Sequence, residues 1–282
     1  MNMESAALYV VATPIGHLAD ITLRALDVLR SVHWIACEDT RHTRPLLSHH
    51  GIEGRLLAVH EHNEAEAAEK VIARLSAGES VALVSDAGTP AISDPGARLV
   101  ARVRAAGHKV VPIPGASALT TALSAAGLDG PFAFVGFLPP KSAARRRELE
   151  KFGSCPLALV FYEAPHRVLE TLEDFAAVYG GERRIVVAKE LTKMFETFRA
   201  CPVAEAPAWF ADDPNRLKGE FVLIVEAPAK GGDAADAEAE RVLALLLAEG
   251  LPVKQAAGLT EKIAGGNKKA HYERALKLRQ SE

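Results

Sequence analysis

Short apolar runs alternate with stretches of helical spacing through the first half of the chain. The apolar runs predict strands at residues 8–12, 34–37, 80–85 and 109–113. Apolar residues three or four positions apart predict the intervening helices, at residues 21–30, 64–75, 94–106 and 116–126. Asp20 and Asp94 are the candidate N-caps of two of these helices. Because buried strands alternate with helices, we expect a mostly parallel sheet in an α/β domain over residues 1–120.

The second half of the chain has a different order of elements. Strands are predicted at residues 132–137, 157–162, 184–189 and 220–225, and one helix lies among them at residues 166–178. These elements predict a second α/β domain over residues 121–228. Residues 138–147 hold two prolines and four basic residues and are expected to form an exposed loop.

A stretch rich in Pro, Gly and Asp predicts a linker, and three helical stretches follow it at residues 237–249, 253–259 and 269–278. The last two are joined across Gly265, Gly266 and Asn267, which predicts a small helix-turn-helix-like tail over residues 237–282. Residues 251–282 hold seven basic and three acidic residues, whereas the whole chain has a net charge of −3. This local charge favours RNA as a partner of the tail; the alternative is a packing appendage.

The composition is typical of a globular protein, with 49% hydrophobic and 24% charged residues. Neither a signal peptide nor an apolar run of roughly 20 residues is found, so we expect a cytoplasmic protein with no membrane partner. The three cysteines have no paired spacing. Four histidines match no compact ligand set, so no metal site is predicted at His49, His50, His60 or His62.

Several loops rich in glycine and proline follow predicted strands. ATPIGHL (residues 12–18), SDAGTPAISDPG (85–96) and PIPGASAL (112–119) lie at the carboxyl ends of parallel strands, where open α/β sheets bind ligands. Glycine and proline can serve only to make tight turns, but three such loops at one sheet edge favour a binding site. Neither G-x-G-x-x-G after the first strand nor G-x-x-x-x-G-K-[ST] occurs, which argues against the usual dinucleotide or triphosphate sites.

Seven motifs occur in order between residues 6 and 226: LYVVATPIGHLADITLRAL, CEDTRHT, VALVSDAGTPAISDPG, VPIPGASAL, GFLPPK, FYEAPHR and GEFVLIV. In order and spacing they resemble the ribosomal RNA small subunit methyltransferase I family, of the tetrapyrrole-methylase-like class of S-adenosylmethionine enzymes. The resemblance implies a class III methyltransferase-like fold, with the cofactor between two α/β domains. It also implies methyl transfer from S-adenosylmethionine to the ribose 2′-oxygen of a cytidine in the decoding region of 16S ribosomal RNA in the small subunit. A homodimer is expected.

The resemblance further implies a set of cofactor contacts, which form the floor of the site, face the methionine part or cover the adenosine. They are Pro14, Gly16, Asp86, Gly88, Ala91, Ser117 and Ala118 in the first half and Tyr162, Leu191, Glu220 and Val222 in the second. The chain departs from the family pattern at His17, where an asparagine is expected. A contact that needs a side-chain amide at that position cannot be carried over.

The proposed reaction needs a proton acceptor more than it needs a metal, because a sulfonium methyl is already activated while a ribose hydroxyl is a poor nucleophile. Asp39 in CEDTRHT and Glu190 at the end of a predicted strand are the candidates, and Lys193 is less favoured. The alternative interpretations are a surface capping cluster around Asp39 and a structural ion pair at Glu190.

Basic residues near the predicted cleft and in the tail are the candidate RNA contacts, because they can clamp or neutralise phosphates. They are Arg41, Lys141, Arg145, Arg146, Lys268 and Lys269. Two competing functions share some of these features: a tetrapyrrole methyltransferase of the same fold, and an RNA-binding module without activity.

Overall fold

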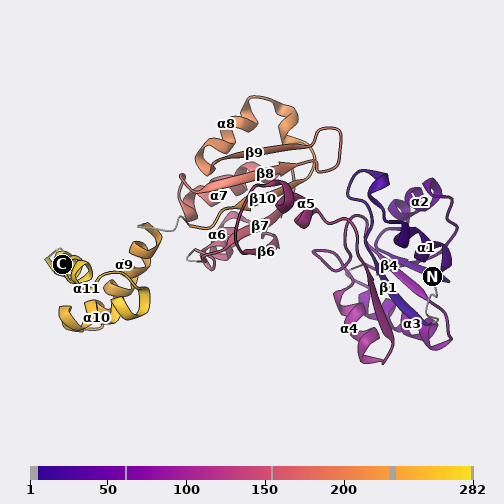
Figure 1. Ribbon diagram of the computed structural model, residues 1–282, viewed down its shortest axis with the longest axis horizontal. Helices are drawn as coiled ribbons and strands as arrows, with labels where there is room; N and C mark the ends of the chain where they lie inside the picture. The colour runs from indigo at the N-terminus through magenta and orange to yellow at the C-terminus, as the bar shows by residue number, and fades with distance from the viewer. Residues whose placement is uncertain (1–5, 61, 154, 229–232, 281–282) are drawn as a thin grey trace.

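The computed structural model describes residues 6–60, 62–153, 155–228 and 233–280. Two α/β domains are followed by a bundle of three helices (Figure 1). The predicted fold class, two α/β domains with a helical tail, is therefore confirmed. Among the described residues, no helix is both long and apolar enough to cross a membrane.

The first sheet has the strand order β3-β2-β4-β1-β5, and all of its pairings are parallel. Its strands are β1 (Ala7–Val11), β2 (Trp34–Cys37), β3 (Arg55–Ala58), β4 (Val81–Val84) and β5 (Lys109–Ile113). After β1 the chain enters a helix that packs on one face of the sheet, and after β4 it enters a helix that packs on the other face. The carboxyl ends of these two neighbouring strands therefore form a topological switch point, where sheets of this kind bind ligands.

Helices cover both faces of the first sheet. On one face, α1 (Leu23–Ser31) and α2 (Thr40–His49) pack against the strands, and on the other face lie α3 (Glu64–Ser76) and α4 (Ala97–Ala105). A short 3-10 helix, Leu18–Asp20, precedes α1. The expected cap at Asp20 is wrong by two residues, because the hydroxyl of Thr22 accepts the N–H of Ala25 and begins the helix there.

The second sheet has the order β6-β7-β10-β8-β9, with β6 parallel to β7 and the other pairings antiparallel. Its strands are β6 (Phe132–Phe137), β7 (Ala158–Glu163), β8 (Arg184–Lys189), β9 (Thr197–Pro202) and β10 (Phe221–Val225). One face packs against α6 (Ser142–Glu150), α7 (Val168–Tyr179) and α8 (Ala206–Ala211). The other face packs against α5 (Ala118–Ala125) and against Ile15 of the first domain. Two further 3-10 helices are Val203–Glu205 and Pro214–Leu217.

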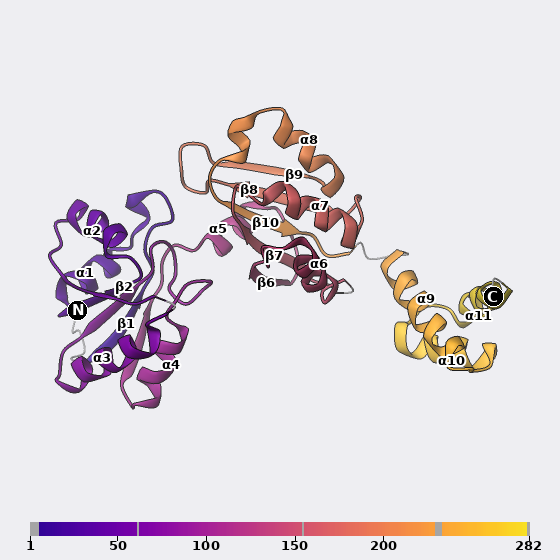
Figure 2. The ribbon, with the colours of Figure 1, turned by 180° about the vertical axis from the view of Figure 1, so that it is seen from behind.

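The tail is a bundle of α9 (Asp233–Ala248), α10 (Val253–Ala264) and α11 (Lys268–Gln280). It has a small apolar core of its own, with Leu243, Val253, Ala256 and Ala275. Both views place it at the opposite end of the molecule from the first domain (Figures 1 and 2). The bundle therefore extends from the two domains as a separately packed unit.

The expected exposed loop at residues 138–147 is wrong, because most of the basic stretch is helical and belongs to α6. Arg145 and Leu149 point from α6 into the domain and are fully buried. The Nε atom of Arg145 lies 2.5 Å from a carboxylate oxygen of Asp174 on α7. Arg145 occupies a buried position that an apolar residue normally takes in an amphipathic helix. The apolar residues of α6 therefore do not show helical spacing in the sequence. A fully buried Arg145 is also not an RNA contact.

Candidate active site

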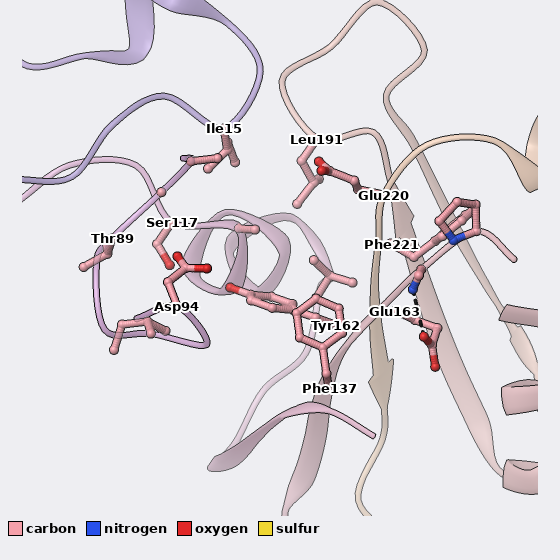
Figure 3. A pocket seen from close by; sticks show the side chains of 17 residues that line it. Ile15, Thr89, Asp94, Ser117, Phe137, Tyr162, Glu163, Leu191, Glu220 and Phe221 are labelled. Atoms are coloured by element: carbon pink, nitrogen blue, oxygen red, sulfur yellow. Dashed lines mark hydrogen bonds between the residues drawn. The ribbon is translucent and has the colours of Figure 1, made fainter. Parts of the chain in front are cut away.

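A pocket lies at the switch point of the first sheet, between the two α/β domains, and encloses about 360 Å³ (Figure 3). The first domain contributes the loops after β1, β4 and β5. The second domain contributes residues from β6, from the turn after β7, from the loop after β8 and from β10. Three of the motifs that follow predicted strands therefore meet in one place, as the parallel order of the strands requires.

Two backbone hydrogen bonds join the loop after β1 to the loop after β4. The N–H of Thr13 donates to the carbonyl of Gly88 (2.8 Å), and the N–H of Gly88 donates to the carbonyl of Thr13 (3.0 Å). Gly88 has a φ of +77°, and a Cβ there would lie 3.3 Å from Ile15. Glycine is required because this backbone conformation is strained for other residues and because Ile15 packs closely. The pair fixes the floor of the pocket.

The loop after β4 is held from outside the pocket by a carboxylate on α3. Glu64 is buried, and its Oε1 accepts the N–H groups of Gly96, Arg98 and Leu99 at the start of α4. The expected N-cap at Asp94 is therefore wrong, because Glu64 satisfies the free N–H groups of the helix end. Asp94 lines the pocket instead. The capping role of Glu64 was missed from the sequence, because Glu64 lies 32 residues before Gly96, the first of the groups it caps.

Asp94 is a titratable group on the first-domain wall. Burial and the nearby charge of Glu38 raise the pKa of Asp94 to about 6, although Ser85 donates a hydrogen bond that opposes the shift. Figure 3 shows Asp94 and Ser117 with their oxygens turned toward the phenol of Tyr162. A half-buried carboxylate that titrates near neutral pH is a common feature of functional sites.

The second-domain wall is mostly apolar. The ring of Tyr162 meets Phe134 and Phe137 edge-on, with centroids 4.9 and 5.6 Å away. Its hydroxyl accepts the N–H of Leu119 in the first turn of α5 (3.1 Å). Burial raises the pKa of Tyr162, so the phenol stays neutral. With Val222 beside it, this wall suits one face of an aromatic ring.

Glu163 also lines the pocket and was not expected there. Its carboxylate is buried and accepts from Arg167 (2.6 Å), from Thr171 (2.6 Å) and from the N–H of Ala164 (2.8 Å). The carboxylate is saturated by these donors, so its role is to hold the turn after β7. The four-residue spacing does not predict this pair from the sequence, because Glu163 ends β7 and Arg167 precedes α7, so the two residues do not share a helix.

The structure divides the expected cofactor residues into two groups. Those that line the pocket are Gly88, Ser117, Ala118, Tyr162, Leu191, Glu220 and Val222. Within the described part of the chain, those that do not line it are Pro14, Gly16, Asp86 and Ala91. A Cβ at Gly16 would lie 2.6 Å from Lys193 and 2.7 Å from Thr192. Gly16 therefore permits close contact between the two domains rather than contact with a ligand.

His17 fulfils locally the capping role that an asparagine performs well. Its Nδ1 accepts the N–H of Ala19 (3.2 Å) and begins the 3-10 helix Leu18–Asp20. Its backbone N–H donates to the hydroxyl of Thr192 in the second domain (3.1 Å). The departure from the family pattern thus retains a capping acceptor at a point where the domains touch.

The two carboxylates expected to act as bases are both engaged by cations. Arg41 binds Asp39 with Nη2 at 2.6 Å, and its hydrogen bonds lower the pKa of Asp39 to about 2. Lys193 lies 2.9 Å from Glu190, and burial of Glu190 is outweighed by hydrogen bonds from Lys193 and from the N–H of Glu220, which lower its pKa. Neither Asp39 nor Glu190 is among the pocket-lining residues of the described chain.

The remaining candidate RNA contacts are at least partly exposed. Arg41 is 88% exposed, and Lys141 lies on the surface just before α6. Arg146 is half exposed, but its Nε lies 2.5 Å from Asp174. Lys268 and Lys269 lie on the surface at the start of α11.

Comparison with known proteins places this geometry in a family. Residues 7–207 match the model of the tetrapyrrole (corrin/porphyrin) methylases, and residues 233–279 match the RsmI C-terminal HTH domain. The chain is 54% identical to ribosomal RNA small subunit methyltransferase I of Pseudomonas aeruginosa over 278 residues, covering 97% of this chain and 98% of the relative. The chain belongs to the ribosomal RNA small subunit methyltransferase I family. The Escherichia coli O157:H7 member is also 54% identical, over 95% of this chain and 94% of its own.

Solved structures share the fold of this family. A cobalt precorrin-4 methyltransferase aligns with a TM-score of 0.59 and 14% identity, covering 78% of this chain and 94% of its own. The uroporphyrin-III-C-methyltransferase of Thermus thermophilus aligns with a TM-score of 0.55 and 22% identity, covering 88% and 99%. These likenesses confirm the expected class III methyltransferase fold of the two α/β domains.

Proposed function

We propose that this protein transfers a methyl group from S-adenosylmethionine to the ribose 2′-oxygen of a cytidine in the decoding region of 16S ribosomal RNA. The proposal is carried by the pocket at the switch point of the first sheet. The chain that forms this pocket matches ribosomal RNA methyltransferases along nearly its whole length. The substrate would be the small ribosomal subunit, in the cytoplasm. The resemblance also favours a homodimer, which light scattering tests.

The pocket residues fit S-adenosylmethionine, which supplies an activated methyl group on sulfur. The volume of about 360 Å³ lies within the usual range for small-molecule sites. Tyr162, Phe137 and Val222 offer an apolar wall for the adenine ring. The start of α5 at Ser117 suits the carboxylate of the donor, because helix N-termini favour anions. Asp94 suits the positive charge of the donor.

The chain itself contributes alignment more than chemical activation. The Thr13–Gly88 pair and the Glu64 cap fix the two loops that would hold the methionine end. Tyr162, bonded to the first turn of α5, links the second-domain wall to this floor. Holding donor and acceptor in line removes most of the entropic cost of a bimolecular reaction, which is worth up to roughly 7–11 kcal/mol.

An RNA substrate is supported by exposed basic residues at two places. Lys141 is exposed and lies four residues after Phe137, which lines the pocket. Lys268 and Lys269 start α11 in the bundle. Cations at both places can neutralise backbone phosphates of one extended substrate.

The direct test uses S-adenosylmethionine labelled on the methyl group and small ribosomal subunits from a strain that lacks the enzyme. We expect label in 16S ribosomal RNA at one cytidine in the decoding region. Alkaline hydrolysis locates the methyl group, because a 2′-O-methyl removes the hydroxyl that attacks the neighbouring phosphate. The labelled linkage should therefore resist alkali. Label on a base, or no label in RNA, contradicts the proposal.

The match to the tetrapyrrole methylase model favours a second candidate, methylation of a tetrapyrrole. The same labelled donor, incubated with a uroporphyrin-type tetrapyrrole in place of subunits, tests it. We expect no transfer, because the relatives that match along the whole chain are named for ribosomal RNA. Transfer to the tetrapyrrole, with none to RNA, would reverse the order of the two candidates.

A further inference from the structure

The proposed reaction still lacks a proton acceptor, because Asp39 and Glu190 are both held as ion pairs. A carboxylate whose pKa is lowered by a bound cation is a weak base, and its oxygens are already occupied by donors. Other titratable side chains lie at the carboxyl ends of β2 and β4, the second of which leads into a loop that lines the pocket.

His42 lies there, in the first turn of α2. Its Nδ1 is 3.1 Å from Oδ2 of Asp86 and 3.7 Å from Oδ2 of Asp39. Asp86 is itself fixed, because its Oδ1 accepts the N–H of Asp39 (3.0 Å). The imidazole is thus held from one side by a carboxylate that the backbone orients.

This contact determines which ring nitrogen is free. At 3.1 Å a lone pair on Nδ1 would repel the carboxylate oxygen of Asp86, so the neutral ring carries its proton on Nδ1. In the neutral ring, Nε2 then keeps its lone pair and acts as an acceptor. Among the described residues we find no partner for Nε2. The side chain of His42 is 68% exposed, so a large substrate can reach it.

The dyad adjoins the pocket through the loop that carries Asp86. The next two residues, Ala87 and Gly88, line the pocket, as does Asp94 further along the same loop. The charges of Glu38 and Asp86 both act on Asp94, so these carboxylates share one electrostatic environment.

We propose that His42 is the catalytic proton acceptor for the ribose 2′-hydroxyl and that Asp86 is its positioning residue. This inference rests on the proposed function. The 2′-oxygen forms a bond to the methyl carbon as the carbon–sulfur bond breaks, and that electron pair stays on sulfur. The hydroxyl proton passes to Nε2 of His42, and the imidazolium later releases it to water.

Carboxylates surround the ring. From the N-cap of α2, Asp39 faces His42; from the end of β2, Glu38 does; from the loop after β4, Asp86 does. The guanidinium of Arg41 engages Asp39. The arrangement resembles the general pattern of a base oriented by a third group.

The test compares His42→Gln and Asp86→Asn with His49→Gln, which changes an exposed histidine at the far end of the same helix. Methylation of small subunits is measured in single turnovers from pH 5.5 to 8.5. We expect His42→Gln to slow methyl transfer by about 10²- to 10⁴-fold, the usual contribution of a general base. Donor affinity, measured by calorimetry, should not change. His49→Gln should match the wild type.

The pH profile separates catalysis from a structural role. The wild-type rate should rise with pH along an acidic limb, because the reaction needs an unprotonated acceptor, and His42→Gln should lose this limb. Asp86→Asn should slow methyl transfer while keeping the limb, because the ring is still present but is no longer oriented by the carboxylate. If His42→Gln keeps the wild-type rate and limb, this inference is wrong while the proposed function stands. If the wild type labels no ribosomal RNA, the proposed function fails first.

Discussion

The two α/β domains place their charged side chains differently around the pocket. In the second domain, buried acids are paired with arginines: Asp174 with Arg145 and Glu163 with Arg167. At the pocket edge of the first sheet, carboxylates gather with fewer cations, and the pKa values of two of them, Glu38 and Asp94, are raised. Burial is the main cause of both shifts, and the charge of Asp86 adds to them.

The difference shows how each domain uses charge. A buried pair costs free energy when one partner is removed, so the pairs of the second domain hold α6, α7 and the turn after β7 in place. Carboxylates that are not neutralised within the protein favour a cationic ligand instead. The carboxylates of the first domain therefore favour a cationic ligand in the pocket, and the second domain contributes a fixed apolar wall.

Removal of a paired cation in the second domain should have the largest effect. Arg145→Met leaves Asp174 buried with fewer donors, and we expect a loss of about 3–5 kcal/mol in the free energy of unfolding. Denaturant unfolding measures it. The affinity of the folded fraction for S-adenosylmethionine should be unchanged, because Arg145 is not among the residues that line the pocket.

The matched control replaces both partners. Arg145→Met with Asp174→Leu should recover much of the loss, because buried pairs can be exchanged for apolar residues at little cost. A single variant as stable as the wild type would show that the pair does not hold the second domain.

Much of the fold could be predicted because the central strands of both sheets, β1, β2, β4, β7, β8 and β10, are almost wholly buried. β2, β5, β6 and β8 have the predicted bounds, and the ends of the other predicted strands differ by at most one residue. The elements that were missed have weak patterns. β3 is an edge strand with Arg55 and Ala58 exposed, and α2 contains Pro45 and buries only Thr43 and Leu47. In α6 the pattern is hidden by a buried arginine.

The site could be predicted down to its loops but not to all of its side chains. Parallel strand order brings the three loops together, so their meeting follows from topology. Which residue of a loop faces the ligand depends on long-range contacts: Glu64 frees Asp94 from capping, and Arg41 engages Asp39. The position of His42 beside Asp86 depends on α2, which the sequence pattern did not predict.

Asp94→Asn tests the electrostatic role of the first domain. At pH 7.5 the wild-type carboxylate is ionised, since its pKa is about 6, and we expect the variant to bind the cationic donor roughly tenfold more weakly. As pH falls through 6, Asp94 takes up a proton and the wild-type affinity should fall toward that of the variant. Calorimetry at pH 7.5 and 5 measures both. An equal affinity of the two proteins at pH 7.5 would contradict the assignment.

The third prediction tests whether the exposed lysines of the helical bundle bind RNA. Lys268→Gln with Lys269→Gln should weaken binding of the small subunit several-fold and reduce the salt slope by about 1.5, the value expected for two lost phosphate contacts. The matched control is Arg146→Gln, because Arg146 is paired with Asp174 and should contribute less to RNA binding. Filter binding over a salt series distinguishes them. Equal slopes for the double variant and the wild type would assign the bundle a packing role.

Glu38→Gln should give the smallest effect, and it tests whether the first-domain carboxylates act on one another. The charge of Glu38 is the second cause, after burial, of the raised pKa of Asp94. Its removal should lower that pKa by on the order of half a unit, equivalent to about 0.7 kcal/mol. The pH below which the affinity for S-adenosylmethionine declines should move down by the same amount, so that at pH 5.5 the variant binds S-adenosylmethionine about twofold more tightly than the wild type.

Glu53→Gln, an exposed change in the same domain, is the control and should leave the pH dependence unaltered. An unchanged midpoint in Glu38→Gln would mean that burial alone sets the pKa of Asp94, and that the carboxylates of this edge act independently.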